Sequence, residues 1–150
     1  PVRLRGDDHR SEVLWAKRLC PARARLKGIP INHGLARFDD EVLIDGVTEG
    51  EVTVDGEATP IFNVLQTVKR SSLRPYGLQL KDAGLEMYFD GLIETLNARK
   101  IPYADWRALM NLTQFPVAVA LSETDSPQKD GTSPVDLEGL VDFGRWVPLE

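Results

Sequence analysis

Residues 41–56, EVLIDGVTEGEVTVDG, decide the fold, because apolar and polar side chains alternate here around turn residues. The alternation covers residues 42–45 and resumes at 51–55, on either side of Gly46. A period of two is typical of strands, and the Asp55-Gly56 pair is a strong turn signal. The stretch therefore predicts a hairpin that turns at Gly46 and has its second strand near solvent.

The residues after this hairpin predict a helix over about 60–70. Thr59-Pro60 resembles a helix start, because proline suits the first helical position. Apolar residues then recur at helical spacing: Ile61, Val64, Leu65 and Val68. Since β-branched residues are frequent in this stretch, a strand is the competing interpretation. Residues 76–80 alternate and predict a short strand.

A long helix is predicted over about 82–100, where one wide apolar stripe follows the helical period. The stripe comprises Leu85, Tyr88, Phe89, Leu92, Ile93 and Leu96. Pro102 ends this helix, and a second helix is predicted over about 103–111. Residues 115–121 predict a strand, and their Val-Ala-Val-Ala-Leu content is typical of a central strand covered on both faces.

The remaining segments complete the expected architecture. Residues 1–10 are predicted to be a flexible basic start, and Ser11 is predicted to cap a short helix that ends at Leu19. Residues 122–134 contain no hydrophobic residue and predict a mobile loop. We therefore expect a single α+β domain over 11–150, in which a mixed, largely antiparallel sheet is covered by helices in a single pair of layers.

The composition is that of an ordinary globular protein. Of the 150 residues, 42% are hydrophobic and 27% are charged, so a core can form without a metal or a disulfide. Cys20 is the only cysteine, which excludes an internal disulfide. No signal peptide is recognisable, and no apolar run approaches the roughly 20 residues of a membrane span. These features favour a cytoplasmic protein without membrane contact.

Charge is distributed unevenly along the chain. Residues 1–27 contain eight basic and three acidic residues, which gives +5, whereas the whole chain carries −5. The remainder therefore carries −10. Such a split is typical of a basic arm that grips nucleic acid or an acidic partner, but the arm could equally pack on its own acidic body.

Few residues suggest catalytic chemistry. Histidine occurs only at His9 and His33, and neither has the spacing to Cys20 that a zinc site needs. A site built from His33 and the acidic residues 39–41 is conceivable, but we expect no metal and no cofactor. Neighbouring arginines would activate an exposed Cys20 thiol, although a buried residue at a helix end is the simpler interpretation.

One constellation resembles that of restriction-type nucleases. Those enzymes place an Asp on one strand and a Glu-x-Lys or Gln-x-Lys on the next, where carboxylates hold Mg²⁺ and the lysine orients the attacking water. Asp45 and Gln79-Leu80-Lys81 are similar to that pattern, with Gln in place of the usual second acid. The resemblance implies a metal-dependent hydrolase if these residues converge in the fold.

Because no stronger catalytic pattern is present, the sequence favours a non-enzymatic protein-interaction module, such as an adaptor, inhibitor or assembly factor. Its partner would be another protein or a second copy of the chain. The expected binding residues are Arg18, Arg23, Arg25, Lys69, Arg70 and Arg74. The alternative is a nucleic-acid-binding protein that uses the basic arm and the 69–74 cluster, and the metal-dependent nuclease-like hydrolase is the third hypothesis.

Overall fold

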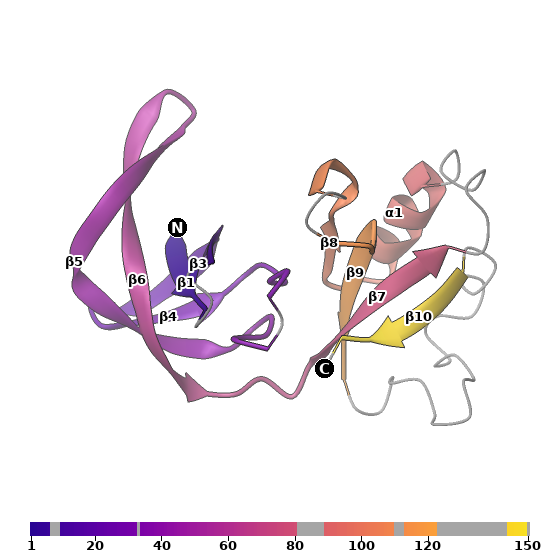
Figure 1. Cartoon of the computed structure of the whole chain (residues 1–150), viewed down its shortest axis with the longest axis horizontal. Helices are drawn as coiled ribbons and strands as arrows, with labels where there is room; N and C mark the ends of the chain where they lie inside the picture. Colours follow the sequence, from indigo (N-terminus) through magenta and orange to yellow (C-terminus); the bar gives the residue numbers. More distant parts are fainter. Residues whose placement is uncertain (7–9, 33, 81–88, 110–112, 123–143, 150) are drawn as a thin grey trace. The chain divides into compact units, whose positions relative to one another are not determined.

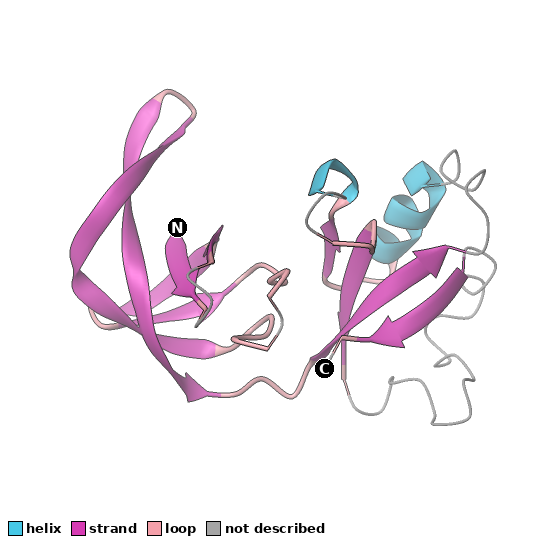
Figure 2. Cartoon of the chain, viewed as in Figure 1, coloured by secondary structure: helices cyan, strands magenta, loops and turns pink. Residues whose placement is uncertain are grey.

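The structure is a computed structural model that describes residues 1–6, 10–32, 34–80, 89–109, 113–122 and 144–149. The chain divides into two compact units, Pro1–Ser71 and Ser72–Glu150 (Figure 1). Within the described residues, ten strands form two sheets, and one α-helix and one short 3-10 helix accompany them (Figure 2). The predicted α+β fold with one helix-covered sheet is therefore wrong, because the described chain is mostly β-strand.

The first unit is built on a six-stranded sheet. Its strands are β1 (Val2–Arg5), β2 (Ser11–Leu14), β3 (Ala16–Cys20), β4 (Arg23–Leu26), β5 (Glu41–Val54) and β6 (Glu57–Lys69). The strand order is β2-β1-β6-β5-β4-β3, and every neighbouring pair is antiparallel except the parallel pair of β1 and β6. β1 thus has a hydrogen-bonded strand on both sides, within the residues predicted to form a flexible start.

This sheet closes on itself at Trp15. β2 and β3 lie at opposite edges of the sheet, yet only Trp15 separates them in the chain. Residues 11–20 therefore form one continuous segment that pairs first with β1 and then with β4. The Trp15 carbonyl accepts a hydrogen bond from the Lys27 N–H (2.9 Å), which holds the junction. The helix predicted over 11–19 is wrong, and the body of the sheet is a small closed barrel.

Apolar side chains from all six strands fill the interior of this barrel. Successive side chains of a strand point to opposite faces, so each strand contributes alternate residues. The buried core comprises Val2, Leu4, Ala24, Leu26, Ala36, Val42 and Ile44, and Leu14, Ala16, Leu35, Phe62 and Val64 pack against it. Because β2 and β3 both contribute to one core, packing as well as hydrogen bonding keeps the barrel closed.

β5 and β6 are much longer than their neighbours and continue past the barrel as a two-stranded extension (Figure 1). β4 pairs with β5 only at residues 41–43, and β1 pairs with β6 only at residues 62–63. Among the described residues, no third strand pairs with residues 45–60, which we call the ribbon. Thr48 pairs with Phe62, and residues 51–54 pair with residues 57–60.

The ribbon turns at Asp55 and Gly56, whose φ angles of 50° and 84° suit a tight hairpin. The Asp-Gly turn signal is confirmed, but the turn predicted at Gly46 is wrong, because β5 runs through that residue. The helix predicted over 60–70 is also wrong, and the competing strand interpretation is confirmed by β6. Pro60 is tolerated in this strand because only β5 lies beside it there.

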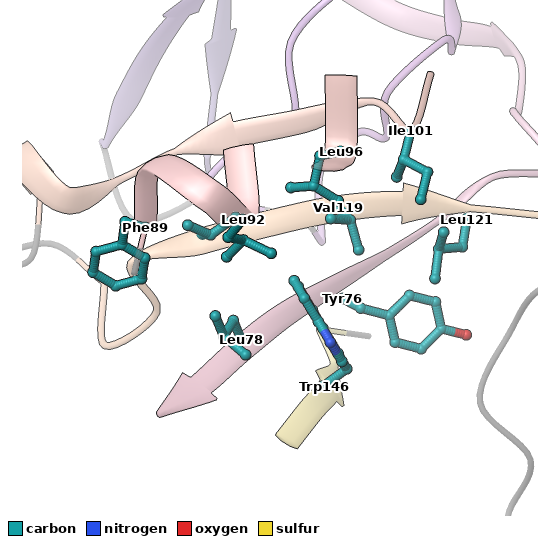
Figure 3. Close-up of a cluster of buried hydrophobic side chains, with 10 residues drawn as sticks. Tyr76, Leu78, Phe89, Leu92, Leu96, Ile101, Val119, Leu121 and Trp146 are labelled. Atoms are coloured by element: carbon teal, nitrogen blue, oxygen red, sulfur yellow. The ribbon is translucent and has the colours of Figure 1, made fainter. Parts of the chain in front are cut away.

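The second unit combines a four-stranded antiparallel sheet with a helix. Its elements are β7 (Arg74–Leu80), α1 (Phe89–Ala98), β8 (Tyr103–Asp105), η2 (Arg107–Leu109), β9 (Val117–Leu121) and β10 (Gly144–Pro148). The strand order is β10-β7-β9-β8, and α1 packs its apolar side against this sheet (Figure 3). The core comprises Tyr76, Leu78, Phe89, Leu92, Leu96, Ile101, Val117, Val119, Leu121 and Trp146.

Several predictions for this unit are confirmed. The strands predicted at 76–80 and 115–121 are β7 and β9. All five residues of β9 are buried and the strand lies between β7 and β8, as expected for a central strand. α1 lies inside the helix predicted over 82–100, of which residues 82–88 fall outside the described part of the chain.

Other predictions for the second half of the chain are not confirmed. The helix predicted over 103–111 is wrong, because β8 and η2 take up all of its described residues except Trp106. The predicted loop at 122–134 lies outside the described residues, except for Ser122. Where the sequence predicts a single domain over 11–150, the structure divides into two compact units.

Close packing at Gly77 generates a first prediction. A Cβ atom on this β7 residue would lie 2.5 Å from the Phe115 ring, whereas a Cβ atom on Gly91 of α1 would meet nothing within 4 Å. Gly77→Ala should therefore lower the free energy of unfolding by about 1–3 kcal/mol. Gly91→Ala, the control, should be neutral or stabilising by up to about 1 kcal/mol. Urea unfolding followed by NMR signals of the second unit compares them, and equal stabilities would contradict the close packing.

Candidate functional site

Cross-strand register brings four basic residues together on the outer face of the first sheet. Lys17 of β3 lies opposite Arg25 of β4, which in turn lies opposite Glu41 of β5. Glu41 also lies opposite Lys69 of β6. Residues opposite one another on neighbouring strands share one face of a sheet, and Arg23, two residues before Arg25, shares it as well. We call Lys17, Arg23, Arg25, Glu41 and Lys69 the basic face.

Glu41 is the single acid of the basic face, and it holds two of the arginines. Nitrogen atoms of Arg23 and Arg25 lie 3.6 and 3.8 Å from its carboxylate oxygens, and 17% of the Glu41 side chain is exposed. Lys17 and Lys69 form no ion pair with any residue that the structure describes. Four cations and one anion leave the basic face with a net charge of +3.

Exposed apolar residues adjoin the basic face on β6. Leu65 is 57% exposed and Val68 is 42% exposed. Each falls at a register shift of β6 against β5, where the partner strand has no residue opposite. A β-bulge of this kind leaves one residue unpaired and redirects its side chain. The two bulges therefore present apolar side chains to solvent on β6, the strand that ends at Lys69.

Three of the six predicted binding residues, Arg23, Arg25 and Lys69, lie together on the basic face. Their binding role remains a prediction. Sequence reasoning missed Lys17, the fourth cation of this face. Arg23 and Arg25 alternate with alanines, and this spacing places both arginines on one face once the segment is recognised as a strand.

The other three predicted binding residues lie elsewhere. The Arg18 guanidinium lies 4.4 Å from the centre of the Phe62 ring, a cation–π distance. Arg70 binds Asp40, and Arg74 begins β7 in the second unit. The predicted 69–74 cluster is therefore divided between the two units.

Asp40 is the one buried charged side chain of the described residues. Its carboxylate accepts hydrogen bonds from the N–H groups of Arg37 (2.9 Å) and Ser71 (2.7 Å). It also accepts a hydrogen bond from the Arg70 guanidinium (2.8 Å). A buried charge is tolerated only when it is paired and hydrogen-bonded, so Arg70 stabilises the fold by compensating this carboxylate.

The arginines of β1 bind the ribbon at Glu49. Arg5 and the Asn63 amide donate to the Glu49 carboxylate, and Arg3 donates to the Glu49 backbone carbonyl (3.0 Å). The pKa of Glu49 is lowered mainly by the hydrogen bond from Asn63. The hydrogen bond and the positive charge of Arg5 lower it further. Gly50, with a φ of 100°, permits the bulge beside Glu49. These contacts fit the interpretation in which the basic start packs on acidic residues of its own chain.

The acids of the conceivable His33 site have other partners. Asp39 binds Lys27 (2.9 Å), Asp40 is buried, and Glu41 belongs to the basic face. His33 itself lies outside the described residues. Over the part of the chain that the structure describes, no group of three or more His, Cys, Asp or Glu side chains could hold a metal ion.

The residues of the nuclease-like constellation fall in different units. Asp45 lies on β5 of the first unit, where its carboxylate accepts a hydrogen bond from the Val47 N–H (3.1 Å). Gln79 lies on β7 of the second unit, and Lys81 is outside the described residues, so this constellation remains a prediction. Cys20 is exposed on β3, and its interpretation as a buried residue at a helix end is wrong.

In the described part of the chain, no helix combines the length and the apolar character of a membrane span. Comparisons with protein-family models, with curated proteins and with solved structures give no match. The function of the basic face must therefore be argued from its own geometry and charge.

Removing the buried charge of Asp40 generates a second prediction. Asp40→Asn keeps the side-chain size but replaces a carboxylate oxygen by an NH₂ group that faces hydrogen-bond donors. We expect the free energy of unfolding of the first unit to fall by about 2–3 kcal/mol. Asp39→Asn, whose ion pair with Lys27 is exposed, should cost less than about 1 kcal/mol. Urea unfolding followed by NMR amides of β5 and β6 compares the variants, and equal losses would contradict the anchoring role of Asp40.

The lowered pKa of Glu49 generates a third prediction. The folded-state pKa of Glu49 lies below the ordinary glutamate pKa. Its contacts therefore stabilise the first unit at pH values above that ordinary pKa. This stability is lost as the pH falls through the lowered folded-state pKa. Arg5→Ala removes one cause, so the NMR titration midpoint of Glu49 should rise towards the ordinary value. Arg145→Ala on β10 is the control and should leave the midpoint unchanged. An unchanged midpoint in Arg5→Ala would contradict the pairing.

Proposed function

We propose that the chain is a protein-interaction module whose basic face docks on an acidic protein surface. The observation that carries this proposal is the cross-strand row of Lys17, Arg25 and Lys69 around Glu41. Together with Arg23, the row places a net charge of +3 on one side of a closed barrel, where the backbone is held by neighbouring strands. A rigid frame of this kind lowers the entropy that side chains lose on binding.

The chemistry of the basic face suits carboxylates. Neighbouring strands lie about 4.7–4.9 Å apart, so the row presents Lys17, Arg25, Glu41 and Lys69 at a regular interval. Arginine offers several donors in one plane and can bind a carboxylate through two parallel hydrogen bonds. Glu41 orients the guanidinium groups of Arg23 and Arg25 but is outnumbered by the cations around it. An acidic side chain of a partner would therefore meet donors that are already positioned.

Exposed apolar residues favour a protein over a nucleic acid as the partner. Leu65 and Val68 are exposed on β6, the strand that ends at Lys69, and protein interfaces combine apolar contacts with hydrogen bonds and charge pairs. A nucleic-acid partner, the alternative, would bind the same cations through its phosphates. Two observations weaken this alternative. The 69–74 cluster is divided between the two units, and Arg70 is already bound to Asp40.

Charge reversal on the basic face generates the fourth prediction. Lys17→Glu combined with Arg23→Glu changes the charge of the face from +3 to −1. Binding of a fluorescent poly-L-glutamate peptide at low salt, measured by fluorescence anisotropy, should weaken at least about 10-fold, because each reversed contact contributes on the order of 1 kcal/mol. The matched control, Lys100→Glu combined with Arg145→Glu, changes the charge equally on exposed residues of the second unit and should leave binding unchanged.

Two results would contradict the proposal. Equal weakening by both double variants would reduce the binding to an effect of net charge. Tighter binding of a mixed-sequence DNA duplex than of the peptide, lost in Lys17→Glu with Arg23→Glu, would replace the protein partner by a nucleic acid. The DNA complex would also show a logarithmic salt slope of about 0.9 per phosphate contact. Thermal melts of each variant establish that it is folded.

A further inference from the structure

The ribbon carries the opposite charge to the basic face. Its residues 45–60 include five acids and no lysine or arginine. The acids are Asp45, Glu49, Glu51, Asp55 and Glu57. The first unit is therefore electrically polarised, with a cationic face on the barrel and an anionic extension that leaves it.

Three of these acids have no partner in the described structure. Asp45 accepts the hydrogen bond from the Val47 N–H, and Glu49 is bound to β1. Glu51, Asp55 and Glu57 form no ion pair with the described residues. Their summed charge of −3 matches the +3 of the basic face in magnitude and is opposite in sign. The chain thus carries a cationic surface and an anionic surface whose net charges are not neutralised within the described structure.

The ribbon also exposes apolar side chains and unpaired strand edges. Val47 is 72% exposed and Val52 is 37% exposed, so apolar groups accompany its charges. From Phe62 towards the turn at Asp55, the two strands pair only with each other, and no other strand of the described residues lies beside their outer backbone groups. A two-stranded hairpin of this kind is only marginally stable in water, and its open edges invite another chain. Contact with a partner would stabilise it.

We propose that the ribbon of one copy docks on the basic face of a second copy. The inference rests on the proposed function, since it names the acidic surface that the basic face binds. Glu57 and Val52 share one face of the ribbon, so Glu57 would meet Lys17 and the arginines of the second copy while Val52 packs near Leu65 and Val68. Glu51 lies on the opposite face of the ribbon and would add to the attraction through its charge. The two surfaces are different, so the contact is head-to-tail and generates a ring or an open filament.

Sedimentation velocity of the full chain tests this inference. The wild type should form oligomers at low salt that grow with concentration and dissociate at high salt, because exposed charge pairs are screened. Lys17→Glu with Arg23→Glu should be monomeric. Glu51→Lys with Glu57→Lys, which changes the three unpartnered acids from −3 to +1, should also be monomeric. Lys100→Glu with Arg145→Glu should associate as the wild type does.

Mixing the two monomeric variants is the decisive step. In an equimolar mixture, the reversed ribbon faces the reversed basic face, and the unchanged surfaces face each other, so both contacts are again complementary. Association should return, with at least about half of the chains in oligomers at the wild-type dissociation concentration. Glu51→Gln with Glu57→Gln gives an independent check, because it keeps the side-chain size and should weaken association at least about 10-fold.

Several outcomes would overturn the inference. These are a monomeric wild type at every concentration and salt, a mixture that stays monomeric, or an association that the charge reversals leave unchanged. Such a result together with face-dependent poly-L-glutamate binding would retain the proposed function and reject the second copy as its partner. Loss of both self-association and peptide binding would reject the proposed function as well.

Discussion

The buried residue Asp40 ties three neighbouring strands of the first sheet together. The carboxylate accepts a hydrogen bond from the N–H of Ser71, just after β6. The backbone carbonyl of Asp40 accepts another from the Leu26 N–H at the end of β4 (3.0 Å). Asp40 directly precedes β5, so these bonds determine where β4, β5 and β6 meet. The positions of Glu41 and Lys69 opposite each other follow from that arrangement. A buried acid thereby sets the geometry of an exposed cationic surface.

Local signals in the sequence predict part of this fold. The Asp-Gly turn and the strands β7 and β9 follow from short patterns that tertiary contacts leave unchanged. The helix predicted over 60–70 fails for a physical reason. Bulges at Leu65 and Val68 each insert a residue into the period of two, so the apolar residues of β6 recur at the spacing of a helix. Pairing with β5 decides between the two structures, and a single sequence does not contain that information.

The candidate site could be predicted only where its residues are close in sequence. Arg23 and Arg25 are two residues apart and share a face in any strand. Lys17 and Lys69 join them only through three strand pairings, whose registers depend on the closed barrel. Arg70 shows the reverse case, in which a residue chosen for its charge compensates a buried carboxylate. Composition identifies cations, but tertiary structure determines which of them remain for a partner.

The parallel pairing of β1 with β6 has a consequence for folding. It joins Val2 to Phe62, so the barrel closes only when segments sixty residues apart have met. Folds that depend on such distant contacts form slowly, because the entropy of closing a long loop is lost before the contacts stabilise the chain. During synthesis, β1 leaves the ribosome long before its partner exists. We therefore expect the emergence of β6 to be the event that commits the first unit to its native topology, while the second unit is still being made.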